Sequence, residues 1–223
     1  SRGDRMRLAI TGADRPMGAM LCRRLAGGHE VLPVGDSDEP GHDLGEARDY
    51  HSADLNLPSA AAPAVRGADV IIHAQPHDPA MGEGPGAEGL LLERISRGTY
   101  VLVQAAVAAH ISRIILISQI GLFDAVPEEY VVNAGWQPRP QPEAESLAPY
   151  MAELVCREIA RVGKIEAVNL RMGDLDRVDG VDGTSADDAV AAVEKALTVD
   201  VLAAGYRWYQ QHVVSAGRFA DSA

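Results

Sequence analysis

Short apolar segments alternate along this chain with longer segments of helical periodicity. We expect strands at residues 7–10, 30–34, 50–52, 69–73, 113–118, 165–171 and 206–214, and helices at residues 16–26, 90–109, 150–162 and 185–197. Consecutive parallel strands need a crossover connection, which is usually a helix, so this alternation is typical of βαβ units. The pattern predicts an α/β fold built on a doubly wound parallel sheet.

Composition and charge limit what such a domain can bind. We expect residues 6–223 to form a single domain, with residues 1–5 as a polar N-terminal extension outside the fold. No apolar run approaches the roughly 18 residues of a membrane span. The net charge of −12 and the lack of a basic stripe argue against a nucleic-acid partner. Cys22 and Cys156 lie in helix-like segments, as buried thiols of a cytoplasmic protein would.

Two sequence features could suggest a metal site, but neither has the ligand spacing that such a site requires. His73 and His77 are four residues apart but follow a strand and are separated by Pro76, so they do not share a helix face. The acidic stretch 174–182 lacks the glycine position and closing glutamate of an EF-hand loop. We therefore expect no metal site.

The first expected strand runs directly into the sequence TGADRPMG and then into a helix. Such a turn points free backbone N–H groups at an anion, and glycines allow the tight turn and close helix packing. Gly12 and Gly18 suit the first and last glycines of a phosphate-binding turn, whereas Arg15 or Pro16 replaces the middle one. Arg15 could bind phosphate through its side chain. The candidate cofactor-binding residues of the turn are Gly12, Arg15, Met17 and Gly18.

Six sequence blocks then follow in a characteristic order: LAITGADRPMG, VGD, ADLN, GADVIIHAQ, RGTYVLVQAA and IILISQIGLFD. The later segments WQPRPQPE, YMAELVCRE and NLRMGDL continue it. Over residues 6–175 the chain resembles the NAD-dependent epimerase/dehydratase family of the extended short-chain dehydrogenase/reductase superfamily. The resemblance implies a Rossmann-like domain that binds a nicotinamide dinucleotide.

The resemblance assigns further cofactor contacts. Asp36, after the second strand, matches a carboxylate that binds the adenosine ribose, which favours NAD over NADP because it repels a 2′-phosphate. Asp54 and Leu55 match positions that flank adenine, and Ala74 matches a small residue beside the dinucleotide. Asp36 is equally explained as a solvated loop aspartate, and Asp54 as a turn residue.

The catalytic positions of the family are only partly present. Tyr150 matches its general acid/base, but Leu154 stands where a lysine should lower the tyrosine pKa. A tyrosine has an ordinary pKa of about 10, so ionising it at pH 7 without a nearby cation costs roughly 4 kcal/mol. Gln119, or Ser118 one residue earlier, matches the substrate-orienting hydroxyl. Tyr150 is also explained as a packed tyrosine at a helix start.

Two other departures from the family pattern also indicate an altered catalytic region. Ile95 replaces an asparagine that is common in the family. Only about fifty residues follow NLRMGDL, so we expect a shortened C-terminal substrate region, unless another chain supplies it.

The apolar residues of the 90–109 helix exceed one buried stripe, which predicts a homodimer. They are Leu91, Leu92, Ile95, Leu102 and Val103.

Three hypotheses remain. The first is a dinucleotide-binding protein that no longer runs the family chemistry. The second is an active epimerase, dehydratase or reductase on a sugar nucleotide or small carbonyl compound, with Arg157 or Lys164 replacing the lost lysine. The third is a scaffold that has lost cofactor binding as well.

Overall fold

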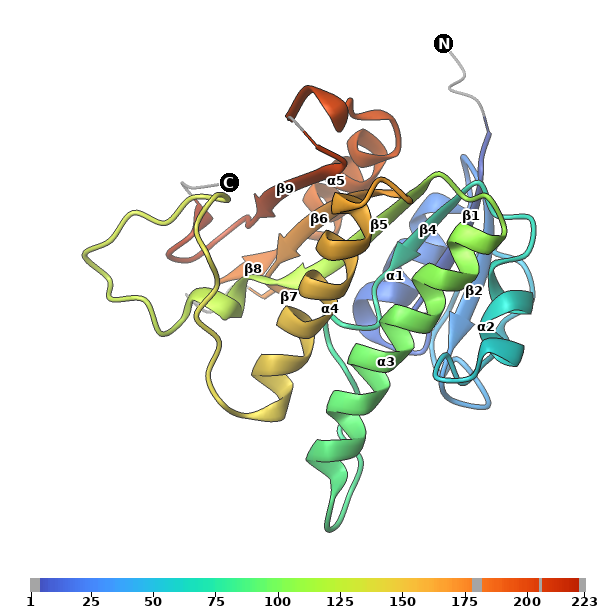
Figure 1. Ribbon diagram of the computed structural model, residues 1–223, viewed down its shortest axis with the longest axis horizontal. Helices are drawn as coiled ribbons and strands as arrows, with labels where there is room; N and C mark the ends of the chain where they lie inside the picture. Colours follow the sequence, from blue (N-terminus) through green and yellow to red (C-terminus); the bar gives the residue numbers. More distant parts are fainter. Residues whose placement is uncertain (1–4, 178–181, 205, 221–223) are drawn as a thin grey trace.

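The computed structural model describes residues 5–177, 182–204 and 206–220, and within them it contains a seven-stranded parallel sheet (Figure 1). The strand order is β3-β2-β1-β4-β5-β6-β9. Its strands are β1 (Arg7–Thr11), β2 (Glu30–Gly35), β3 (His51–Ser52), β4 (Val70–His73), β5 (Arg113–Gln119), β6 (Glu166–Met172) and β9 (Trp208–Val213). A separate pair is formed by β7 (Asp174–Leu175) and β8 (Gly183–Thr184). The expected doubly wound, Rossmann-like sheet is confirmed.

Helices cover both faces of the sheet (Figure 1). On one face lie α2 (Pro58–Val65), α3 (Ala87–Ala108) and α4 (Ala144–Arg161), and on the other lie α1 (Pro16–Leu25) and α5 (Ala186–Thr198). Short 3₁₀ turns occur at η1 (Ile120–Phe123) and η2 (Leu202–Ala204). The strand order reverses direction at β1 and β4. In open α/β sheets, ligands bind beyond the carboxyl ends of the strands at this switch point.

The central strands are buried on both faces, which explains their nearly continuous apolar sequences. Along β5, Ile114 and Leu116 face the α2–α3–α4 layer, whereas Ile115 and Ile117 face α1 and α5. Successive strand side chains point to opposite faces, so one short strand contributes to both cores. Cys22 and Cys156 are buried thiols, and burial raises the pKa of each to about 12.

The long irregular region after β5 packs as a small third core. Phe123, Val126 and Val132 from this region bury against Val214 and Phe219 near the C-terminus. Arg218, from that terminal segment, donates to the backbone oxygens of residues 126 and 127, both at 2.6 Å. These contacts hold the loop beyond the carboxyl ends of β5 and β9.

Two helical boundaries differ from the sequence expectation. The expected elements do not include Pro58–Val65, which forms the helix α2. Pro58 occupies the first helical turn, where its missing N–H has no helical partner anyway. The helix expected at residue 150 begins at Ala144 and includes Pro149. The helix therefore begins six residues earlier than expected and continues through a proline.

No helix in the described part of the chain is long and apolar enough to cross a membrane. Residues 1–4 of the expected N-terminal extension, and Asp179 of the acidic stretch, lie outside the described residues.

Candidate functional site

The glycine turn after β1 brings strand, turn and helix into direct contact. Gly12 has a φ of 69°, and a Cβ on it would lie 2.7 Å from the backbone nitrogen of Gln75. A Cβ on Gly18 would lie 2.1 Å from the carbonyl oxygen of Gly12. Both contacts are shorter than real Cβ atoms allow, so both positions require glycine. The turn thus sets α1 as close to β1 as backbone contact permits.

The N-terminus of α1 is open toward this turn. Arg15 is its N-cap residue and Pro16 its first helical residue, and no side chain of the described residues caps the helix. The Met17 side chain is buried in the core, so this residue can meet a ligand only through its backbone. Uncapped amides at a helix start suit a phosphate, because the N–H groups and the helix dipole both favour negative charge.

The Arg15 side chain reaches from the turn to the loop after β4. Its Nε donates to the carbonyl oxygen of Asp78 at 3.0 Å, and a terminal nitrogen lies 3.1 Å from the Asp78 carboxylate. Both side chains are partly exposed. The guanidinium therefore lies at the switch point, close to where a bound phosphate would meet the start of α1.

Asp36 lies at the end of β2 on the opposite side of the turn. Its Oδ2 accepts from Nε2 of Gln75 at 2.7 Å and lies 3.9 Å from Nε of Arg94. Burial is the main cause that raises the pKa of Asp36, and the carboxylates of Asp14 and Asp54 add to it. The Gln75 hydrogen bond and the Arg94 charge act in the opposite direction.

Gln75 and Asp14 were not singled out from the sequence. Asp14 accepts the backbone N–H groups of Asp36 and Ser37, at 3.1 and 3.0 Å, and so fixes the end of β2 against the glycine turn. Gln75 is buried, and its Oε1 has no hydrogen-bond partner among the described residues. The one available signal was their place in the chain, with Asp14 two residues after Gly12 and Gln75 directly after Ala74. An orphaned buried oxygen beside Asp36 suits a ligand that donates hydrogen bonds, as ribose hydroxyls do.

The other expected cofactor positions lie in different surroundings. Asp54 is exposed, and its Oδ1 accepts the backbone N–H of Asn56 at 3.0 Å. Leu55 is buried in the core beneath α3, near Gly98. Ala74 is buried in the core on the α1 side. Leu55 and Ala74 are thus core residues, and only Asp54 is exposed where a base could approach.

A buried chain of hydrogen bonds joins the strands that carry the glycine turn and Gln75. The Nδ1 of His73 lies 2.6 Å from the Thr11 hydroxyl, and its Nε2 lies 2.9 Å from the Thr99 hydroxyl. Thr11 also accepts the backbone N–H of Gln75 at 3.3 Å. The two ring nitrogens of the neutral His73 thus bridge the hydroxyls of Thr11 and Thr99, one nitrogen donating and the other accepting. Burial lowers the pKa of His73 to about 3, so the ring is neutral and serves to link β1, β4 and α3.

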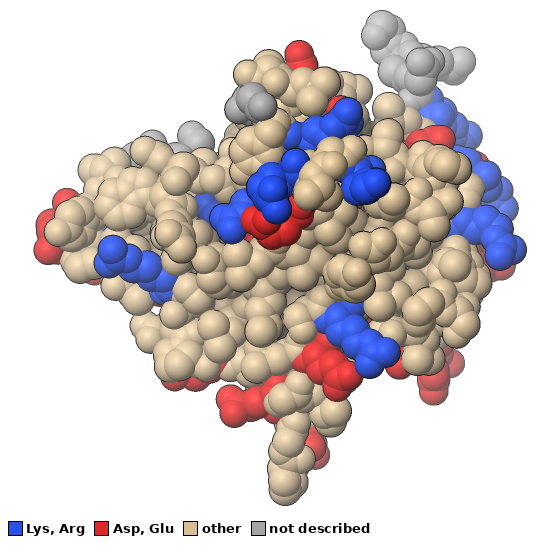
Figure 2. Space-filling view, viewed as in Figure 1, with Lys and Arg blue, Asp and Glu red and all other residues tan. Residues whose placement is uncertain are grey.

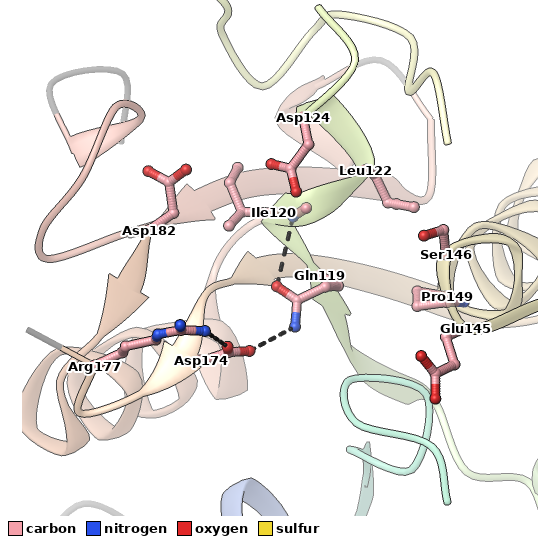
Figure 3. Close-up of a pocket in the computed structure, with 11 residues that line it drawn as sticks. Gln119, Ile120, Leu122, Asp124, Glu145, Ser146, Pro149, Asp174, Arg177 and Asp182 are labelled. Carbon is pink, nitrogen blue, oxygen red and sulfur yellow. Dashed lines mark hydrogen bonds and ion pairs between the residues drawn. The ribbon is translucent and has the colours of Figure 1, made fainter. Parts of the chain in front are cut away.

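Gln119 lies at the end of β5 beside a cavity of about 250 Å³ (Figure 3). Its Nε2 is 3.3 Å from the carbonyl oxygen of His77 and 3.4 Å from Oδ1 of Asp174. We call this cavity the Gln119 pocket. The side of α4 that lines it presents Glu145, Ser146 and Pro149.

The Gln119 pocket is acidic. Four carboxylates and one guanidinium line it: Asp124, Glu145, Asp174, Asp182 and Arg177. A terminal nitrogen of Arg177 is 2.9 Å from the Asp174 carboxylate. Burial is the main cause that raises the pKa of Asp124, and the nearby Asp182 carboxylate adds to it.

Ser118 points away from this pocket into the protein. It is fully buried, and its hydroxyl donates to Oε1 of Glu153 at 2.7 Å. Glu153 in turn accepts two hydrogen bonds from Arg171, each of 2.8 Å, in a buried bidentate pair. The Arg171 guanidinium also lies 5.0 Å from the centre of the Phe123 ring. Ser118 is thus part of a buried charge network that the sequence analysis did not anticipate.

Tyr150 lies in a second cavity, of about 270 Å³, on another side of α4. Its hydroxyl accepts from Nε2 of Gln137 at 3.4 Å. Leu154 and Arg157 line the same cavity, whereas Lys164 lies exposed beyond the end of α4. The structure therefore places Tyr150, Gln119 and Ser118 in three separate environments and does not bring them together.

Comparison with known proteins gives the family. A family model described as NAD(P)H-binding matches residues 12–160. An L-arabinose 1-dehydrogenase (NAD(P)(+)) of Haloferax volcanii is 27% identical over 188 residues, which are 78% of this chain and 69% of that protein.

Two solved structures show the same fold. Glucuronic acid dehydrogenase from Chromohalobacter salexigens has a TM-score of 0.77 and 23% identity, covering 95% of this chain and 77% of that one. A uronate dehydrogenase mutant from Agrobacterium tumefaciens, complexed with NAD, has a TM-score of 0.74 and 21% identity, covering 94% and 76%. These structures confirm the expected Rossmann-like fold. Because the family model spans more than half of the chain and begins at Gly12, the protein belongs to the NAD(P)H-binding family.

Proposed function

We propose that the protein binds a nicotinamide dinucleotide at the carboxyl ends of β1, β2 and β4 but does not carry out the redox chemistry of the dehydrogenases that it resembles. In this role it would be a structural or regulatory protein that responds to dinucleotide occupancy. When bound, the nicotinamide ring would supply a hydride acceptor or donor. The chain's own residues would hold the nucleotide without supplying the acid/base partner.

The binding half of the proposal rests on the residues around the glycine turn. The uncapped amides at the start of α1 would meet the pyrophosphate, and Arg15 would exchange its contact with Asp78 for one with phosphate. Asp36 would accept ribose hydroxyls, and Gln75 would offer its unpartnered Oε1 to the same sugar. The family match supports a nicotinamide dinucleotide as the ligand.

A preference for NAD over NADP is the finer part of this proposal. A carboxylate at Asp36 repels a 2′-phosphate. Arg94 lies only 3.9 Å from that carboxylate, and its positive charge offsets part of the repulsion. We therefore expect NAD to bind more tightly than NADP but not to exclude it.

The observation that carries the non-catalytic half is the side of α4 that faces Gln119. This side presents Glu145, Ser146 and Pro149, none of which can act as a tyrosine–lysine pair. Tyr150 lies in the other cavity, with Leu154 one helical turn later. No cation therefore stands beside Tyr150 at the position from which the family's lysine would act.

A turnover assay tests this half. The purified protein is incubated with NAD or NADP and with L-arabinose or D-glucuronate, and reduced cofactor is followed by absorbance. We expect no turnover above a protein-free blank, and Tyr150→Phe should change nothing. Turnover that Tyr150→Phe abolishes would overturn the proposal.

The second candidate is an active sugar dehydrogenase, which the similarity to an L-arabinose dehydrogenase favours. Tyr150 would then act as the acid/base, with Arg157, two helical turns later in the same cavity, replacing the lysine. Gln119 would have to orient the substrate. This candidate predicts turnover that both Tyr150→Phe and Arg157→Gln abolish.

We also propose a homodimer through α3 and α4, but the residues that support it differ from those expected from the sequence. Leu91, Ile95, Leu102 and Val103 pack in the protein's own core, so they leave no surplus stripe. The exposed apolar residues of α3 are instead Leu90 and Tyr100, whose exposed fractions are 61% and 52%. Figure 2 shows a broad uncharged surface over these two helices. Large exposed apolar patches mark interaction surfaces.

A further inference from the structure

The cavity that contains Tyr150 holds an unusual share of the chain's aromatic residues. Both tryptophans of the chain, Trp136 and Trp208, line it, together with Tyr150 and Tyr206. We call it the tryptophan pocket. It lies between α4, the loop residues 135–138 and β9.

The tryptophan pocket is separate from the proposed cofactor site. Gln119 and the α4 residues at positions 145, 146 and 149 line the Gln119 pocket, whereas the α4 residues at 150, 153, 154 and 157 line the tryptophan pocket. The helix therefore stands between the two cavities. A ligand in the tryptophan pocket would not contact Asp36 or the glycine turn, so this inference does not depend on the proposed dinucleotide binding, although the pocket shares Tyr150 and Arg157 with the second candidate function.

Buried hydrogen bonds hold one wall of the tryptophan pocket in place. Arg171 and Glu153 form it as a buried bidentate pair. Arg171 also donates to the carbonyl oxygen of Ala134 and to Oε1 of Gln210, each at 3.2 Å. These bonds tie the loop, β6 and β9 together beneath the cavity. A preformed wall lowers the entropic cost of binding a ligand.

The charge of the lining favours an anion. Arg171 and Glu153 neutralise each other, which leaves Arg157 as the unbalanced charge among the lining residues. The Arg157 side chain is 40% exposed and contacts Glu158 at 3.4 Å, but Glu158 is held more closely by Arg161 at 2.7 Å. Figure 2 shows several basic side chains, with an acidic group among them, where α4 ends beside β9.

The size and the walls of the pocket narrow the ligand further. Its volume of about 270 Å³ lies just below the range of about 300–1,000 Å³ that is typical of drug-sized ligands. A single ring fits this space, whereas a dinucleotide does not. Indole and phenol faces prefer to stack on flat rings, and a guanidinium binds a carboxylate through two parallel hydrogen bonds.

We propose that the tryptophan pocket is a second ligand site, which takes a small carboxylate with a flat ring. The ring lies between the aromatic side chains, and the carboxylate pairs with Arg157 at the mouth of the pocket. Gln137 and Gln210, which also line the pocket, supply further hydrogen bonds.

Intrinsic tryptophan fluorescence tests this proposal directly, because both tryptophans report from the pocket. The protein is titrated with benzoate, with benzamide, which keeps the ring without the charge, and with glucuronate, which keeps the charge without the flat ring. We expect saturable quenching with benzoate and weaker binding of the other two. Tighter binding of glucuronate would overturn the assignment of a flat ring, and no saturable response to any of the three would overturn the site.

Two matched charge variants locate the ligand. Arg157→Gln should weaken benzoate binding by about tenfold or more, as expected for the loss of a charge-assisted contact. Lys164→Gln removes an exposed positive charge beyond the end of α4, outside the pocket and without touching the Glu158 pairs, and should leave affinity within about twofold. Equal losses in both variants would mean general charge attraction only. Displacement of benzoate by NAD would place benzoate in the cofactor site and overturn the proposal.

Discussion

Replacing Glu153 with alanine should strongly destabilise the protein, because this side chain is the partner of a buried charge. The exposed fractions of the Arg171 and Glu153 side chains are 2% and 5%. Glu153 accepts three hydrogen bonds: one of 2.7 Å from Ser118 and two of 2.8 Å from Arg171. The substitution leaves the Arg171 guanidinium buried without its counterion.

The expected loss follows from this burial. Breaking a buried pair by removing one partner costs about 3–5 kcal/mol, because the remaining charge is uncompensated. Ser118 loses its acceptor as well, so the upper part of that range applies. For a domain of this length, each kcal/mol corresponds to roughly 2–4 °C in Tm, so a loss of about 4–5 kcal/mol should lower the midpoint by about 8–20 °C.

Urea unfolding followed by circular dichroism measures this loss. Glu158→Ala is the matched control, since Glu158 lies on the same helix and pairs with Arg161 at 2.7 Å but is 49% exposed. The control should cost less than about 1 kcal/mol. The double variant Glu153→Leu/Arg171→Met should recover most of the loss. A Glu153→Ala protein as stable as Glu158→Ala would refute the reasoning.

Three further predictions concern the turn, pH and assembly. Gly18→Ala should abolish dinucleotide binding and lower Tm, because its Cβ would lie 2.1 Å from the Gly12 carbonyl oxygen; calorimetry that finds unchanged affinity would contradict this. Burial lowers the pKa of His73 to about 3, against about 6.5 unfolded, so protons favour the unfolded state below pH 6.5. The free energy of unfolding should therefore fall as the pH is lowered from 6.5 to 4. The substitution His73→Asn should make this fall less steep, by up to about 1.4 kcal/mol per pH unit. Urea titrations that give the same pH dependence for the wild type and the variant would refute the prediction. Tyr100→Glu should convert a dimer into a monomer by light scattering, whereas a wild-type mass of one chain would sink the dimer.

The sequence was sufficient where local pattern determines structure. Apolar strands such as residues 113–118 lie within the observed β5, because a strand buried on both faces must be apolar throughout. The turn at Gly12 was also recognisable from the sequence, because its structure requires glycine. The φ of residue 12 is positive, and a Cβ there would collide with the backbone of Gln75. Such features depend on neighbours in sequence or on glycine itself.

The sequence was insufficient where partners are distant. Glu153 and Arg171 are 18 residues apart, and Gln75 and Asp36 are 39 apart, so their pairings become visible only once the sheet is assembled. The environment of Tyr150 was hidden for a related reason. Its helix begins at Ala144, and which residues of that helix line each cavity depends on how α4 packs.

Calorimetric titration with NAD, NADH, NADP and NADPH tests the central claim most directly. Wild-type protein should bind saturably, with NAD tighter than NADP, and Asp36→Ala should weaken NAD binding by about tenfold or more. Asp38→Ala, an exposed carboxylate two residues later, is the matched control and should bind as the wild type does. Absence of binding at millimolar cofactor, or equal effects of the two variants, would contradict the account.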